Sequence, residues 1–121
     1  MRHLCKWSAL GICTVLALLT LLLVLPGLLG IHPLLVQSGS MEPEYPVGSV
    51  IYVREADSAA LAEGDVVTFY LPDEETLVTH RIVRVDREKE EIYTKGDANE
   101  LEDGAATPFS LIVGTPILCI P

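Results

Sequence analysis

The sequence LVTHRIVRVDR, residues 77–87, decides the fold class, because apolar and polar side chains alternate along it. A period of two is typical of a β-strand with one buried face. Within residues 32–121, only residues 57–63 could form a short helix. Other strand-like runs occur at residues 49–55, 65–71, 91–95, 111–113 and 116–120. The turn formers between the runs are Pro46, Gly48, Pro72, Gly96 and Gly104. We therefore expect a mainly β domain over residues 32–121, built as a small barrel-like or folded sheet.

The N-terminal part differs from the rest, because residues 7–31 contain no charged side chain and ten leucines. About 20 helical residues, at 1.5 Å each, cross the ~30 Å core of a bilayer. A cleaved signal peptide is the alternative, but its apolar core spans only about 7–15 residues before a small-x-small site. Residues 28–30 are Leu-Leu-Gly, which does not fit that site. We expect an uncleaved membrane anchor whose helix ends between Leu25 and Ile31, near Pro26.

Charge is distributed unevenly around this anchor. Arg2 and Lys6 precede it, and all 17 acidic residues follow it. The positive-inside rule then predicts that residues 1–6 lie in the cytoplasm and residues 32–121 outside it. The protein would lie in the cell membrane, or in the endoplasmic reticulum membrane of a eukaryote. The acidic excess argues against nucleic acid as a partner, because no basic patch would bind phosphates.

The cysteines predict neither a disulfide framework nor a metal site. Cys5 and Cys13 lie at or within the anchor, and Cys119 lies near the end of the sequence. No pair has metal-ligand spacing such as Cys-x-x-Cys, and the three histidines are too scattered for a zinc motif. We therefore expect no metal ion.

Residues 37–43, QSGSMEP, follow the anchor closely and could supply a nucleophile. Two serines flank a glycine, so the chain can turn tightly there, and Pro43 prevents a regular helix. A serine in such a turn can present its hydroxyl and nearby backbone N–H groups to one carbonyl. A serine nucleophile with an oxyanion hole requires this arrangement. The alternative is an ordinary polar loop that leaves a membrane helix.

His80 could supply a base, because it shares a strand face with Val78 and Ile82. Desolvation among apolar side chains disfavours the imidazolium, which keeps the ring able to accept a proton. The alternative is a structural histidine on a half-buried face. Residues 94–103, TKGDANELED, follow as an acidic loop. A carboxylate from this loop could orient the imidazole, or the loop could be a solvated turn.

Together these motifs resemble those of type I signal peptidases, in the branch typical of the endoplasmic reticulum, archaea and some Gram-positive bacteria. The motif SGSMEP resembles the nucleophile motif, and residues 64–69 (GDVVTF) resemble the strand that follows it. Residues 79–83 (THRIV) resemble the base motif, and residues 94–99 (TKGDAN) the acidic motif. The resemblance covers residues 8 to about 114. It implies a membrane-anchored serine endopeptidase that removes signal peptides from secretory preproteins without a cofactor.

By this resemblance, Ser40 is the nucleophile and His80 the general base, while the Ser40 N–H and the Ser38 hydroxyl form the oxyanion hole. The family's acidic loop has two recurring aspartates, which are Asp97 and Asp103 in this sequence. We expect Asp103 to orient His80. We expect Asp97 to have a supporting role, with its carboxylate accepting local backbone N–H groups.

The resemblance also implies partners. These are the signal peptides of preproteins, the lipid bilayer and accessory membrane subunits, with small residues at the first and third positions before the scissile bond. Members of the family often continue past a segment like residues 114–121 into a second membrane helix, whereas this sequence ends at Pro121. That departure favours an alternative function, a non-catalytic anchored β domain that serves as a partner subunit. The intact set Ser40, His80, Asp97 and Asp103 favours the peptidase.

Overall fold

The computed structural model describes all of residues 1–121, and the chain divides into two compact units, Met1–Ile31 and His32–Pro121. The first unit is helix α1 (Arg2–Leu28), which is 27 residues long with a mean hydropathy of 2.6. The helix begins before the apolar run and ends within the expected range, with Pro26 inside it. It is long and apolar enough to cross a membrane, which fits a single-pass membrane protein.

The second unit is built on one seven-stranded sheet with the order β1-β2-β7-β3-β4-β5-β6. Its strands are β1 (Ile31–Leu35), β2 (Val50–Glu55), β3 (Val66–Tyr70), β4 (Leu77–Asp86), β5 (Glu91–Lys95), β6 (Thr107–Pro108) and β7 (Ile112–Ile120). Its short 3₁₀ helices are η1 (Gly39–Met41), η2 (Ser58–Ala60) and η3 (Phe109–Leu111). This architecture confirms the predicted mainly β fold behind one apolar helix.

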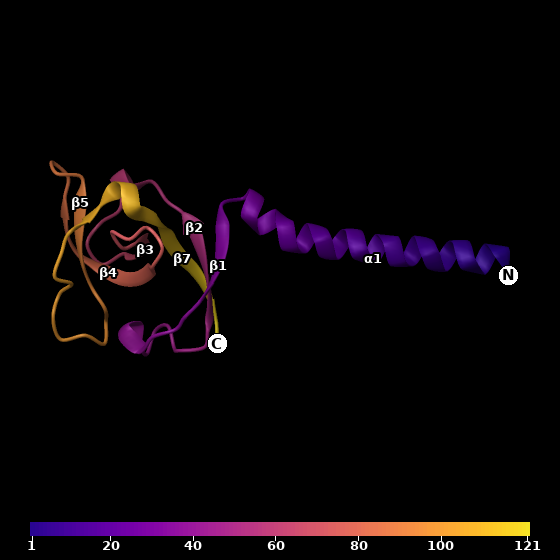
Figure 1. Ribbon diagram of the computed structural model, residues 1–121, viewed down its shortest axis with the longest axis horizontal. Helices are drawn as coiled ribbons and strands as arrows, with labels where there is room; N and C mark the ends of the chain where they lie inside the picture. The colour runs from indigo at the N-terminus through magenta and orange to yellow at the C-terminus, as the bar shows by residue number, and fades with distance from the viewer. The chain divides into compact units, whose positions relative to one another are not determined.

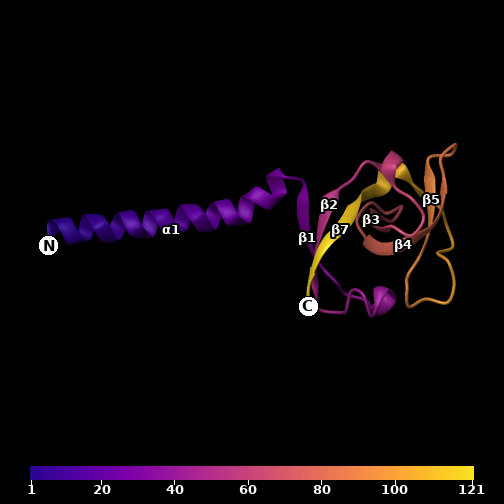
Figure 2. The ribbon, with the colours of Figure 1, turned by 180° about the vertical axis from the view of Figure 1, so that it is seen from behind.

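The sheet is strongly curled. The β5 strand lies on one side of the β3–β4 pair, and β2 and β7 lie on the other, as the front and back views show (Figures 1 and 2). The register shifts at three places, where one strand has an extra residue: β7 has one at Ile117 against β2 and one at Val113 against β3, and β4 has one at Val83 against β5. Such bulges bend a strand and increase its twist, so they account for much of the curl.

Strand β7 differs from the sequence-based expectation, because residues 111–113 and 116–120 do not form two separate strands. One strand, Ile112–Ile120, runs through Pro116. This proline lies opposite Val53, next to the bulge at Ile117 of β7, and beyond the point where β3 stops pairing with β7. A proline is tolerated where one edge of a strand has no partner, since its missing N–H leaves no hydrogen bond unmade.

Alternate residues of β3, β4 and β5 form the core with Leu61. The core residues are Leu61, Val67, Phe69, Ile82 and Ile92, and each is at most 4% exposed. The same strands bury three polar side chains, Thr68 on β3, His80 on β4 and Thr94 on β5. A buried polar group is costly unless it forms hydrogen bonds. Thr68 pairs with the Thr79 hydroxyl, and both His80 and Thr94 bond to Asp103.

Candidate active site

A tight turn after β1 holds Ser40. The η1 helix begins directly after Ser38, whose backbone is extended, and the buried side chain of Met41 fixes its other end. The hydroxyl oxygens of Ser38 and Ser40 are 3.2 Å apart, so one hydroxyl donates to the other. The turn therefore presents two hydroxyl groups side by side.

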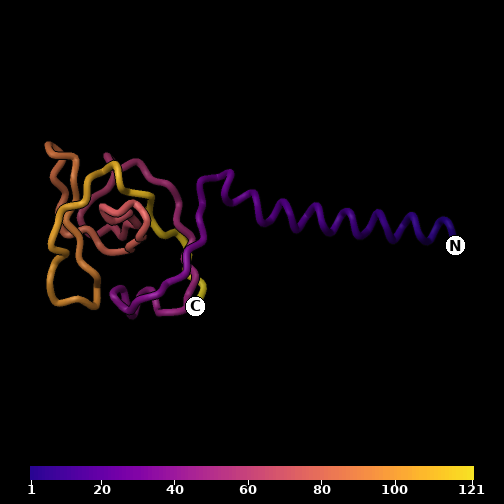
Figure 3. The backbone as a smooth tube through the Cα atoms, viewed as in Figure 1, coloured from indigo at the N-terminus to yellow at the C-terminus, as the bar shows by residue number.

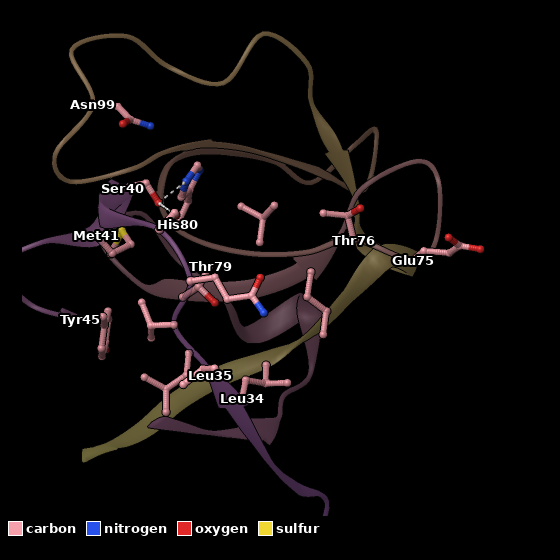
Figure 4. A pocket seen from close by; sticks show the side chains of 16 residues that line it. Leu34, Leu35, Ser40, Met41, Tyr45, Glu75, Thr76, Thr79, His80 and Asn99 are labelled. Atoms are coloured by element: carbon pink, nitrogen blue, oxygen red, sulfur yellow. Dashed lines mark hydrogen bonds between the residues drawn. The ribbon is translucent and has the colours of Figure 1, made fainter. Parts of the chain in front are cut away.

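His80 reaches this turn from β4. Its side chain is mostly buried, and the edge of the Phe69 ring packs near it, with ring centroids 6.4 Å apart. The imidazole Nε2 lies 3.2 Å from the Ser40 Oγ, a contact that Figure 4 shows as a dashed line. On its other side, Nδ1 lies 2.6 Å from the Asp103 Oδ2. The structure thus brings Ser40, His80 and Asp103 into one hydrogen-bonded chain.

Asp103 is itself held in place by β5. Its Oδ2 accepts a hydrogen bond from the buried Thr94 hydroxyl, and its backbone N–H donates to the Thr94 carbonyl at 2.8 Å. A carboxylate can only accept, so the His80 Nδ1 carries the hydrogen in this contact. The Nε2 lone pair then faces the Ser40 hydroxyl. This tautomer can accept a proton from the serine.

Asp97 does not bind local backbone N–H groups, and that expectation was wrong. Its carboxylate accepts two hydrogen bonds from Arg81, from Nε at 2.9 Å and from a terminal nitrogen at 2.7 Å. The same guanidinium donates to Glu44 and, at 2.8 Å, to the Gly64 carbonyl. A planar guanidinium binds a carboxylate at two points, which is stronger and more directional than a turn contact. Asp97 therefore ties the loop after β5 to β4.

The electrostatics of this clamp follow from its geometry. Hydrogen bonds from Arg81 lower the pKa of Asp97, and the Asp97 carboxylate raises the pKa of Arg81. Both members of the Arg81–Asp97 pair therefore remain charged at neutral pH. Nearby, burial raises the pKa of the Tyr45 hydroxyl, and the charge of Glu44 raises it further.

The loop between β5 and β6 also docks directly onto the serine turn. The Ala98 N–H donates to the Ser40 carbonyl at 2.9 Å, and Figure 3 shows this loop beside the turn at η1. Gly96 makes the approach possible, because a Cβ there would lie only 2.7 Å from the Ser40 carbonyl oxygen. A larger residue would push the loop and the turn apart.

A cleft of about 620 Å³ opens at Ser40 and His80. Its walls are mixed: apolar side chains including Leu34, Leu35 and Val78 lie on one side of Ser40, and Asn99 lies on the other (Figure 4). One wall is a free strand edge. The β3 strand pairs with residues 77–81 of β4, whereas β5 pairs with β4 only from Arg81 onward. Residues 77–80 thus leave one backbone edge open, and such an edge can accept an added strand.

The cysteines stay apart, and no group of three or more His, Cys, Asp or Glu side chains is arranged to hold a metal ion. Reasoning from the sequence assigned no role to Arg81, Thr94 or Asn99. Arg81 is the clearest omission, because it is one of few cations in a strongly acidic domain and directly follows His80. Its partner depends on how the loop after β5 crosses the sheet, which no local pattern reveals.

The chain resembles known proteins over most of its length. The family described as "Signal peptidase, peptidase S26" matches residues 7–100, which include Ser40, His80 and Asp97 but end before Asp103. Signal peptidase I W of Bacillus subtilis is 48% identical over 73 residues, covering 58% of this chain and 38% of that protein. The signal peptidase complex catalytic subunit SEC11 of Clavispora lusitaniae is 37% identical over 70 residues, covering 56% of this chain and 42% of that protein.

The human signal peptidase complex catalytic subunit SEC11C is 32% identical over 72 residues, covering 56% of this chain and 37% of that protein. The chain thus spans about two fifths of the length of the relatives it matches. The family match itself extends from the apolar helix through the serine turn, the histidine strand and the start of the acidic loop. Because this match covers most of the chain, the chain belongs to the signal peptidase family, peptidase S26.

Proposed function

We propose that this protein is a membrane-anchored serine endopeptidase that removes signal peptides from secretory preproteins. The observation that carries the proposal is the chain of contacts from Ser40 through His80 to Asp103, which opens into the cleft. Membership of the signal peptidase family supplies the substrate class. The proposal assigns Ser40 as nucleophile, His80 as general base and Asp103 as the residue that orients the imidazole.

The reaction would proceed in two proton-balanced halves. The Ser40 hydroxyl gives its proton to the His80 Nε2 as Oγ attacks the scissile carbonyl carbon. The tetrahedral intermediate collapses, the C–N bond breaks, and His80 returns the proton to the leaving amine. A water molecule then gives a proton to His80 and attacks the acyl-serine ester. The second tetrahedral intermediate collapses, the bond from the acyl carbon to Ser40 Oγ breaks, and His80 returns the proton to Oγ, which releases the signal peptide and restores the Ser40 hydroxyl.

The oxyanion of each tetrahedral intermediate would bind to the Ser40 backbone N–H and the Ser38 hydroxyl. Support comes from the 3.2 Å separation of the two hydroxyl oxygens, which places the Ser38 group beside the attacking atom. Preorganised donors of this kind stabilise charge that develops only during the reaction. Loss of one such donor typically lowers kcat by about 10²–10³-fold, and we expect this for Ser38→Ala.

The signal peptide would bind in extended form along the cleft. The open backbone edge of residues 77–80 can pair with it, and the apolar walls at Leu34, Leu35 and Val78 suit the apolar end of a signal peptide. Pairing through the backbone needs no particular side chain. Small residues at the first and third positions would then let the peptide lie close to Ser40.

The apolar helix would hold the site at the membrane surface where signal peptides arrive. Strand β1 begins at Ile31, three residues after α1 ends at Leu28, so the linker spans roughly 10 Å at most. Enzyme and preprotein would share one bilayer, which raises their effective concentration. With Arg2 and Lys6 before the helix, we place the N-terminus in the cytoplasm and residues 32–121 outside it.

The test is cleavage of a model preprotein by the full chain in detergent or liposomes. Ser40→Ala should lower the rate by several orders of magnitude, because the nucleophile is lost while the fold is kept. Ser110→Ala is the matched control, since Ser110 is an exposed serine of η3 that does not line the cleft. Cleavage by Ser40→Ala at near the wild-type rate, in protein free of host peptidase, would disprove the serine mechanism.

A further inference from the structure

Asn99 occupies a place in the cleft that the reaction described above does not use. Its side chain lines the cleft together with Ser40 and His80, yet it joins the hydrogen bonds of the chain only through its backbone. The backbone N–H donates to the Gly96 carbonyl at 3.0 Å, and the carbonyl accepts from the Lys95 Nζ at 2.8 Å. The residue is thus fixed at its main chain, while its amide faces the cleft without a partner.

The amide of Asn99 lies beside the serine turn. A Cβ added at Gly96 would lie 2.7 Å from the Asn99 Nδ2 and 2.7 Å from the Ser40 carbonyl oxygen, so the amide covers Gly96 next to the serine turn. The adjacent Ala98 N–H is bonded to that same Ser40 carbonyl at 2.9 Å. The main chain of Ala98 and Asn99 is therefore fixed beside the serine turn, and the Asn99 side chain lines the cleft from there.

The position of Asn99 indicates which part of a substrate it would meet. In Figure 4, Ser40 and His80 lie between Asn99 on one side and Leu34 and Leu35 on the other. Leu34 and Leu35 belong to β1, the strand that follows the membrane helix in sequence. This apolar side of the cleft suits the signal peptide. The segment after the scissile bond must leave on the opposite side, past the imidazole that protonates its amine. That side carries Asn99.

We propose that Asn99 binds the backbone of the first residues of the mature protein, on the leaving-group side of the scissile bond. This inference rests on the proposed peptidase function. A primary amide offers both donors and an acceptor, so it can pair with a peptide group, which has one of each. Such a contact reads no side chain, and it therefore suits an enzyme whose substrates differ in their mature sequences. It positions the leaving amine near His80.

The experiment compares two substrates of the full chain in detergent. Both carry the same signal-peptide end with alanine at the first and third positions before the bond. One continues for four residues of mature sequence, and the other ends in an aminocoumarin amide at the scissile bond. Asn99→Leu preserves the branched shape over Gly96 but removes the polar atoms. Glu100→Gln is the control, because it changes an exposed neighbour in the same loop that does not line the cleft.

For Asn99→Leu we expect kcat/KM to fall about tenfold on the extended substrate, as the loss of one or two neutral hydrogen bonds predicts. On the aminocoumarin substrate kcat/KM should stay within about twofold of wild type, because no mature backbone is present. Asn99→Ala should give the same pattern. Equal losses on both substrates, or no loss on either, would overturn the assignment of Asn99. Failure of the wild-type chain to cleave either substrate would instead overturn the proposed function.

Discussion

The loop between β5 and β6 is fixed at both ends, and its two aspartates contact different groups. At the first end, Asp97 binds Arg81 through two hydrogen bonds. At the second end, Asp103 binds the imidazole of His80 and the hydroxyl of Thr94. At the Arg81 end one cation lies between the carboxylates of Asp97 and Glu44, whereas the His80 end leads to a hydroxyl in an open cleft.

The difference comes from the strand that both aspartates meet. His80 and Arg81 are neighbours on β4, and successive side chains of a strand point to opposite faces. One aspartate therefore binds on the face with the core and the serine, and the other binds on the opposite face. We therefore propose that two identical side chains on one loop have different roles, one in orienting the base and one in holding the loop.

The largest effect should come from Asp103→Asn. The amide keeps the size of the side chain but loses the charge that stabilises imidazolium and fixes the Nδ1–H tautomer. In a serine triad this change costs about four orders of magnitude in kcat. We expect a comparable loss in preprotein cleavage, with a melting temperature close to that of the wild type. Activity near the wild-type level would mean that Ser40 and His80 act without the carboxylate.

Gly96→Ala should come next, because it disturbs the contact between the loop and the serine turn. The new Cβ would lie 2.7 Å from the Ser40 carbonyl oxygen, so the turn must shift. A displacement of about 1 Å at a catalytic group can cost roughly 10²-fold in rate. Gly104→Ala in the same loop is the matched control, since a Cβ there meets nothing within 4 Å. Equal activity of the two variants would contradict the proposed docking.

Asp97→Asn should lower activity less than either change above, and it should lower stability more than Asp103→Asn does. The substitution leaves the Arg81 guanidinium without its two-point partner. Hydrogen bonds to charged groups contribute roughly 1.5–3 kcal/mol each, and neighbouring Glu44 will retain part of this. We therefore expect the melting temperature to fall by several degrees.

A double-mutant cycle isolates this clamp. If Arg81 and Asp97 act as a pair, Arg81→Gln combined with Asp97→Asn should cost less stability than the sum of the single changes, with a coupling of about 0.5–3 kcal/mol. The measurement is urea unfolding of the four proteins on one preparation. Additive losses would show that the two side chains contribute independently. If Asp97→Asn were inactive but as stable as the wild type, then Asp97 would be the aspartate that the reaction needs, and the roles assigned to Asp97 and Asp103 would be reversed.

The smallest effect is a pH dependence of stability. Because the folded-state pKa of Asp97 is lowered, chiefly by hydrogen bonds from Arg81, the carboxylate stabilises the fold above its unfolded-state value of about 3.9. This contribution is lost as the pH falls through the folded-state value. The stability difference between wild type and Asp97→Asn should therefore narrow below about pH 4. Asp73, whose pKa is lowered mainly by the Thr76 hydroxyl, is present in both proteins and cancels in the comparison.

The sequence by itself determined the features that depend on neighbouring residues. Strand-like runs over residues 49–55, 65–71 and 91–95, and the alternation along residues 77–87, predicted β2 to β5 to within one residue at each end. The uncharged run over residues 7–31 predicted the helix. The motifs around Ser40, His80 and the two aspartates named the residues to compare, although their roles stay predictions.

Tertiary structure decided the features that depend on distant partners. Strands β1 and β6 were not predicted, since each is short and contains a proline, and only pairing across the sheet makes them strands. The continuity of β7 through Pro116 depends on where β3 stops pairing with it. The partner of Asp97 depends on the path of a loop over β4, and the open amide of Asn99 depends on how that loop docks on the serine turn. Local sequence fixes which face a side chain takes along a strand, whereas the group that it meets there is set by contacts between residues far apart in the chain.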